Sequence, residues 1–158
     1  MGEYNEQGGM RMREDKLQTI SRSYQEICEG KDPWLPLGNF MHDFFGSHTT
    51  RRKKLVKDPL RLPEQPTPEQ HRWAVFCAAS VEYLCQKYQL PIPHWVYDPV
   101  YTLSEAWYYS PYADLPDVRQ ELEAQAPEPF KQRNIYCSNR VFANKYEIAA
   151  DLQQRRSA

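Results

Sequence analysis

The sequence predicts an all-α fold: a compact single domain of about five to six helices around a central buried helix over residues 67–89. Apolar residues recur at intervals of three and four in several stretches, which is typical of helices. The stretch 67–89 also begins with a strong helix-start pattern and is apolar around more than one face. With 158 residues the chain has the size of one ordinary domain. We expect that domain over residues 11–153, with a disordered tail at 1–10 and a frayed end at 154–158.

The first helix is expected from about Arg13 to Gly30, since glycine favours a helix end. Its apolar side chains share one face, because they are spaced by three and four residues: Leu17, Ile20, Tyr24 and Ile27. The two prolines in residues 32–36 then predict a loop that carries a partly buried Trp34.

A short buried helix should follow, capped by Asn39 and stopped by Gly46. It contains four large apolar residues: Phe40, Met41, Phe44 and Phe45. Residues 51–57 are expected to add another helical turn, and the proline-rich stretch 60–66 should be an extended connector.

The central helix has the clearest pattern in the chain. Thr67 is expected at the N-cap, Pro68 at the first helical position and Gln70 at the position that completes a capping box. Apolar residues then step by three and four: Trp73, Cys77, Val81, Leu84 and Tyr88. The helix must end near Leu90, because Pro91 and Pro93 follow. We therefore predict a buried helix around which the others pack.

The segment 94–112 is rich in aromatic residues and shows no lasting period of 2 or 3.6. We expect an irregular segment with one short helix capped by Ser104. Two roles stay open for it, a cover over the central helix and a surface that binds a partner, because tyrosine and tryptophan suit both. The candidate partner-binding residues are Trp95, Tyr97, Tyr101, Trp107, Tyr108 and Tyr109.

Three helices are expected after this segment. The first begins at Asp114 as a cap and buries a face of Leu115, Val118, Leu122 and Ala126. A short helix follows at Phe130. The last is capped by Ser138 and shares a face among Val141, Lys145, Ile148 and Leu152.

Composition excludes several classes of protein. Charge is balanced, with 20 Lys and Arg against 21 Asp and Glu, so the overall field favours no polyanion or anionic membrane. No apolar run reaches the length of a membrane span, and the first residues lack the apolar core of a secretory signal, so we expect a cytoplasmic protein without a membrane partner. The four cysteines show no CxxC spacing and favour reduced core residues.

A basic cluster is the strongest charged feature of the sequence. Six positive residues lie within residues 51–61: Arg51, Arg52, Lys53, Lys54, Lys57 and Arg61. They could contact nucleic-acid phosphates or another anion. Docking onto a protein, or onto the acid-rich region 98–128 of the same chain, is the favoured alternative.

No catalytic, metal or cofactor motif is apparent. The histidines and acids at residues 42–48 and 69–71 lack the spacing of a zinc site, and no glycine-rich phosphate loop is present. One enzymatic alternative stays open, in which Cys77 or Cys85 pairs with His71 or His94 through a tertiary contact. We expect no cofactor and no metal.

Two stretches, Trp73 to Cys85 and Phe130 to Tyr136, resemble parts of small uncharacterised bacterial proteins, and the resemblance covers residues 34–150. Some of those proteins are encoded beside nucleotidyltransferase-like or regulatory genes, as antitoxin-type partners are. The resemblance implies a partner-binding role and names no activity. We therefore expect a non-enzymatic protein-interaction or regulatory protein, with nucleic-acid binding through residues 51–61 and a small cysteine-dependent enzyme as the alternatives.

Overall fold

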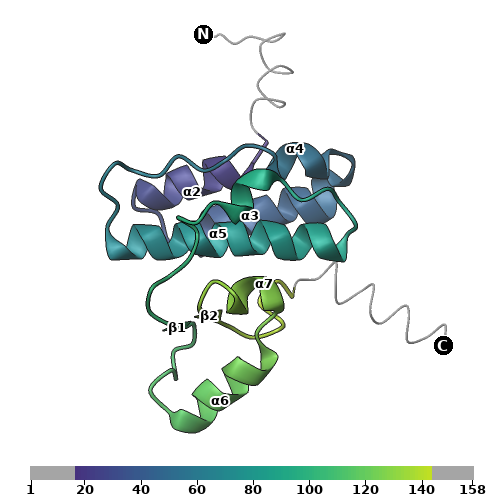
Figure 1. The fold of residues 1–158 in the computed structure, drawn as a ribbon. Helices are drawn as coiled ribbons and strands as arrows, with labels where there is room; N and C mark the ends of the chain where they lie inside the picture. Colours follow the sequence, from purple (N-terminus) through teal and green to yellow (C-terminus); the bar gives the residue numbers. More distant parts are fainter. Residues whose placement is uncertain (1–16, 144–158) are drawn as a thin grey trace, which may run out of the picture.

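The computed structural model describes residues 17–143 and confirms an all-α architecture. The central helix α5 (Pro68–Lys87) lies between two layers (Figure 1). One layer holds three helices: α2 (Ile20–Cys28), α3 (Trp34–His42) and α4 (Arg52–Val56). The other holds the helices α6 (Pro116–Gln125) and α7 (Glu128–Lys131) and a small parallel sheet of two strands, β1 (Trp107–Tyr108) and β2 (Ile135–Tyr136). Within residues 17–143 no helix is both long enough and apolar enough to cross a membrane.

Helix α5 begins as the sequence predicts. Thr67 Oγ1 accepts a hydrogen bond from the Gln70 amide at 3.0 Å, and Gln70 Oε1 accepts one from the Thr67 amide at 2.9 Å. Every residue from Trp73 to Glu82 is buried. The helix ends where Gln89 adopts a left-handed backbone (φ 58°) and the Leu90 amide bonds to the Cys85 carbonyl at 2.8 Å. The predicted central helix is confirmed.

The first helix of the described chain, α2 (Ile20–Cys28), also agrees with its predicted pattern. All four residues of the expected apolar face are buried, and Thr19 supplies the N-cap. Gly30 follows the helix with φ 106°, a conformation that costs glycine little. The expected start near Arg13 lies outside the described residues.

Helix α3 (Trp34–His42) includes residues 34–36, so the prediction of a loop over residues 32–36 is wrong for that part. Pro33 and Pro36 lie at the helix start, where the first amides have no intrahelical partner, so proline is tolerated there. The Asp32 carboxylate accepts the Trp34 amide at 3.0 Å. Asn39 therefore lies in the middle of α3 and not at its start, so the prediction of an N-cap there is wrong.

Gly46 does not stop this helix, because the chain continues as a π-helical turn, Asp43–Ser47. Phe40, Phe44 and Phe45 are buried as expected. A 3₁₀ turn (Thr49–Arg51) and α4 (Arg52–Val56) follow, which confirms the helical turn predicted at residues 51–57. The connector 60–66 contains no helix or strand, as expected.

After α5 the chain makes a 3₁₀ turn at His94–Tyr97, which contacts α4, and then enters the second layer as β1 (Trp107–Tyr108), which pairs in parallel with β2 (Ile135–Tyr136). The predicted helix after Ser104 is wrong. The Trp107 amide bonds to the Asn134 carbonyl at 2.8 Å and the Tyr109 amide to the Tyr136 carbonyl at 2.9 Å. A pairing partner distant in sequence therefore decides the local structure.

Helices α6 (Pro116–Gln125) and α7 (Glu128–Lys131) confirm the two helices predicted around residues 114–130. Asp114 is not the cap of α6: Leu115 holds that position, without a side-chain hydrogen bond, and is exposed. Leu122 and Ala126 are buried as expected. Ser138 Oγ accepts the Arg140 amide, but residues 139–142 form turns, so the prediction of a helix that starts at Ser138 is wrong for this stretch. The later part of that predicted helix, with Lys145, Ile148 and Leu152, lies outside the described residues.

A buried ion pair joins α5 to the second layer. Arg133 Nη1 donates to Glu82 Oε1 at 2.6 Å, and the Phe76 and Phe130 rings pack with centroids 5.2 Å apart. These contacts link the stretches 73–85 and 130–136.

Candidate functional site

The two surface features that the sequence singles out meet at one point of the fold. Trp95, near the start of the aromatic segment, donates its indole N–H to the carbonyl of Val56, the last residue of α4, at 3.0 Å. Val56 is buried and Trp95 is partly buried, so this bond fixes the 3₁₀ turn against the end of the basic run. Residues 53–59 and 91–95 consequently form the walls of one pocket.

This basic-apolar pocket has a volume of about 460 Å³. Its apolar and aromatic lining residues are Val56, Pro59, Pro91, Ile92, Pro93 and Trp95. Three further lining residues carry or can gain a positive charge, and all three are exposed: Lys53, Lys57 and His94. The pocket thus combines an apolar lining with cations that water can reach, a combination that favours an amphipathic anion.

The other residues of the basic cluster have different roles. Arg52 turns inward: its guanidinium lies 4.7 Å from the Phe44 ring centre and 4.6 Å from that of Tyr88, and its Nε donates to the Phe44 carbonyl at 2.8 Å. Arg52 therefore anchors α4 to the core. Lys54 and Arg61 are exposed but do not line the pocket, and Arg51 is half-buried.

The alternative in which the basic cluster docks onto the acid-rich region 98–128 finds no support, because no ion pair joins residues 51–61 to that region, both of which the structure describes. Helices α4 and α6 lie on opposite sides of α5 (Figure 1). One α6 carboxylate, that of Glu123, instead accepts the Tyr108 hydroxyl. The cations of α4 are therefore not neutralised by α6.

The aromatic segment is partly a cover for the core and partly surface. Tyr101 is only 4% exposed and packs against Trp95, with ring centres 5.4 Å apart, so it cannot contact a partner as predicted. Burial, with the nearby Asp98, raises the Tyr101 pKa to about 12. Trp107 and Tyr109 are half-buried and pack against Trp73, with their ring centres 5.3 and 5.8 Å from that of Trp73.

Other aromatic residues of the segment reach the surface. Tyr97 is 54% exposed, although its hydroxyl donates to the buried Glu82 carboxylate at 2.7 Å. Tyr108 stacks on Tyr136 at 5.0 Å and is half-buried. Tyr112, which the prediction left out of the partner-binding set, is 65% exposed. Tyr97 and Tyr112 are therefore the exposed aromatic residues of the segment.

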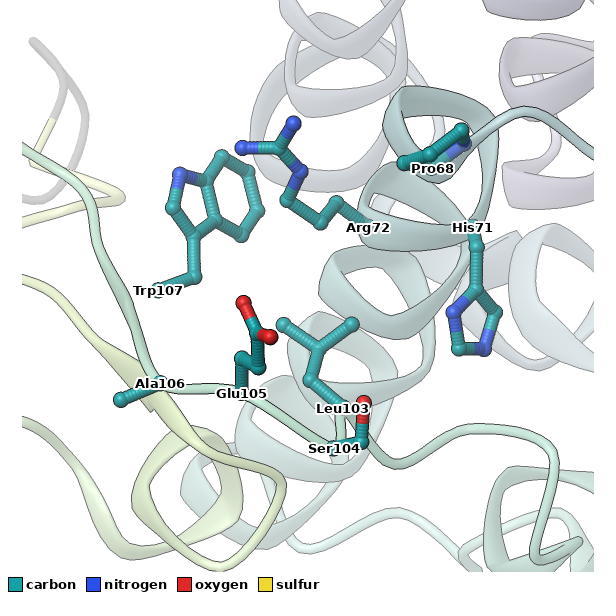
Figure 2. A pocket seen from close by; sticks show the side chains of 8 residues that line it. All are labelled: Pro68, His71, Arg72, Leu103, Ser104, Glu105, Ala106 and Trp107. Carbon is teal, nitrogen blue, oxygen red and sulfur yellow. The ribbon is translucent and has the colours of Figure 1, made fainter.

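Two more hollows lie between the start of α5 and residues 103–111. The first, of about 410 Å³, is lined by Pro68, His71, Arg72, Leu103, Ser104, Glu105, Ala106 and Trp107 (Figure 2). The second, of about 620 Å³, is lined by Glu69, Arg72, Trp73, Trp107, Tyr108, Tyr109, Ser110 and Pro111. They share Arg72 and Trp107, whose guanidinium and ring centre are 5.6 Å apart. Sequence reasoning did not single out Arg72, because a lone arginine near the start of a helix carries no pattern.

The cysteine-based alternative finds little support in the geometry. Cys77 and Cys85 are buried on α5, and burial raises the pKa of both thiols, that of Cys85 to about 11. The Nε2 atom of His71 lies 2.7 Å from the Val100 carbonyl oxygen. Buried thiols with raised pKa values are poor nucleophiles at neutral pH.

Among residues 17–143, no three His, Cys, Asp or Glu side chains are grouped so that they could hold a metal ion. Comparison of the chain with models of protein families, with curated proteins and with solved structures finds no match.

Proposed function

We propose that this chain is a non-enzymatic interaction protein, of the antitoxin or adaptor type, that binds another protein through the basic-apolar pocket. The observation that carries the proposal is the hydrogen bond between Trp95 and Val56, which places the basic run and the aromatic segment around one hollow. Each feature alone has an ordinary structural explanation. Their combination in a pocket of about 460 Å³ favours a binding site.

The chemistry of the pocket defines the partner. Ile92, Trp95 and their proline neighbours accept an apolar or aromatic side chain, whose burial supplies most of the affinity. Lys53 and Lys57 attract carboxylates beside that anchor and increase the rate of association. The partner is therefore an acidic protein segment with an aromatic or aliphatic anchor.

Nucleic-acid binding is the second candidate, because Lys53, Lys54, Lys57 and Arg61 are all exposed and could approach phosphates. Two observations favour a protein. Arg52 packs inward instead of toward solvent, which reduces the outward charge. The pocket is lined mainly by proline and aliphatic residues, whereas single-stranded nucleic acid needs exposed aromatic faces on which bases stack.

Selection from a displayed library of random peptides tests the proposal. We expect enriched peptides to carry Asp or Glu next to an aromatic or aliphatic residue, and to bind more weakly as salt rises. The double substitution Lys53→Glu and Lys57→Glu should lower their affinity at least about tenfold. Both residues are exposed, so neither change should affect folding.

Lys54→Glu is the matched control, because Lys54 lies on the same helix and is exposed but does not line the pocket. It should leave peptide affinity within about twofold of the wild-type value. Equal losses in the Lys54 variant and the double variant would contradict the proposed pocket. Oligonucleotides that bind more tightly than any selected peptide, with the same dependence on Lys53 and Lys57, would replace it with the nucleic-acid function.

A further inference from the structure

Arg72 and Glu105 bring opposite charges to the same hollow, the one of about 410 Å³ beside the first turns of α5. Figure 2 shows the Glu105 carboxylate turned toward the space between Trp107, Leu103 and the Arg72 side chain. His71 points away from that space, toward the Val100 carbonyl oxygen 2.7 Å from its Nε2. The hollow is therefore a compartment with a cation and an anion on separate walls.

These two charges do not neutralise each other. Within the described part of the chain, neither Arg72 nor Glu105 has a carboxylate or cationic partner within 4.0 Å. Arg72 is half-buried and its guanidinium lies over the Trp107 ring, 5.6 Å from its centre. A guanidinium held on an aromatic face keeps its N–H groups available at the edge. Both charges can therefore bind groups supplied from outside.

The wall that carries Glu105 is held at both ends. The Leu103 amide bonds to the Arg133 carbonyl at 3.2 Å and the Trp107 amide to the Asn134 carbonyl at 2.8 Å. Asn134 Nδ2 also donates to the Leu103 carbonyl at 2.7 Å. Only three residues, 104–106, lie between these fixed points, so the backbone position of the exposed Glu105 is largely set before any ligand arrives.

We infer that this hollow binds a small zwitterion of the α-amino-acid type. Arg72 binds the ligand carboxylate, because a guanidinium forms charge-assisted hydrogen bonds with it, and Glu105 binds the ammonium group. The ligand side chain lies against the Trp107 indole and the buried Leu103, which favours an aromatic or aliphatic residue. The lining of this hollow shares no residue with the basic-apolar pocket, so the inference stands independently of the proposed function.

Titration of isotope-labelled protein with L-phenylalanine and L-leucine, followed by NMR, tests the inference. We expect saturable shifts at the Trp107 indole N–H and the Ala106 amide. Two analogues test each charge separately: L-phenylalanine amide lacks the carboxylate, and N-acetyl-L-phenylalanine lacks the ammonium group. Each analogue should bind at least about tenfold more weakly, which is the loss expected for one charge-assisted interaction.

Substitutions then connect each ligand group with its residue. Arg72→Gln should abolish the preference for L-phenylalanine over its amide, and Glu105→Gln the preference over the N-acetyl form. Glu69→Gln is the matched control, since Glu69 lines only the neighbouring hollow. Shifts that do not saturate by about 20 mM ligand would mean an affinity too weak for a specific site, and they would overturn the inference. Analogues that bind as well as L-phenylalanine, or equal effects of the Glu69 and Arg72 substitutions, overturn it as well.

Discussion

Glu82 and Arg133 form a buried ion pair across 51 residues of sequence, with Nη1 and Oε1 2.6 Å apart. They are 3% and 5% exposed. Arg133 also donates to the carbonyls of Pro129 and Val96, at 2.7 and 2.8 Å, and Tyr97 donates to the second Glu82 oxygen. The pair thus joins α5, α7 and the 3₁₀ turn at residues 94–97, and its charges are matched by hydrogen bonds on both sides.

Breaking this pair should strongly destabilise the fold. Arg133→Met leaves the Glu82 carboxylate buried without its cation, a change that costs about 3–5 kcal/mol of unfolding free energy. The double substitution Glu82→Met and Arg133→Met should cost less than the sum of the two single changes, because no unpaired charge remains. Urea unfolding of the three variants measures this coupling. Additive losses would show that the pair does not act as a unit.

The left-handed backbone at Asn134 should make the free energy of unfolding sensitive to substitution at this position. Asn134 has φ 68° and its side chain donates to the Leu103 carbonyl, just before β2. Asn134→Ala adds the cost of that backbone conformation to the lost hydrogen bond, together about 2 kcal/mol or more. Asn134→Gly loses only the hydrogen bond and should cost about half as much. If the glycine variant unfolds as easily as the alanine variant, backbone strain is not the cause.

The four cysteines should differ in their reaction with iodoacetamide. Cys28 is partly exposed, whereas Cys77, Cys85 and Cys137 are buried. We expect native protein at neutral pH to be alkylated first at Cys28, and the buried three only in urea, because buried thiols are inaccessible and hold their protons. Mass spectrometry of digested protein locates the modified residues. Rapid native alkylation of Cys77 or Cys85 would restore the cysteine-dependent enzyme as an alternative.

Stability should fall at alkaline pH through the buried thiols. Burial raises the pKa of Cys85 from 9.0 to about 11 and that of Cys137 from 9.0 to about 12. The folded state holds these protons more tightly than the unfolded state does. The contribution of the two thiols to the free energy of unfolding is therefore complete below pH 9.0 and is lost as pH rises toward 11 and 12. Unfolding free energies measured along this range should decline less steeply in the double variant Cys85→Ala and Cys137→Ala. Equal slopes in the two proteins would assign the decline to other groups.

Local patterns in the sequence account for the elements that were predicted correctly. The capping box at Thr67 and Gln70 and the spacing of apolar residues along α5 act within a few residues of one another, so they can be read without the fold. The error at α3 came from treating Pro33 and Pro36 as breaks, although a helix start accepts proline. Strand β1 could not be predicted, because it depends on pairing between Trp107 and Ile135.

The candidate site was predicted only in parts. Lys53, Lys57 and Trp95 were singled out as members of two separate features, and nothing local indicates that Val56 and Trp95 meet. Tyr101 was expected at an interface but is buried, since the segment 94–112 alternates between inward and outward aromatic residues without a regular period. The Glu82–Arg133 pair did leave a signal, because a glutamate inside the apolar run of α5 needs a buried partner.

The most direct test of the proposed docking site is NMR mapping of a selected acidic peptide onto the isotope-labelled protein. The account predicts that shifts concentrate at the Trp95 indole N–H, Val56 and Ile92, and that Lys53→Glu with Lys57→Glu removes them. The resonances of Trp107 and Tyr112, which lie outside this pocket, should not move. Shifts centred on Trp107 or Tyr112, with Trp95 unaffected, would contradict the account.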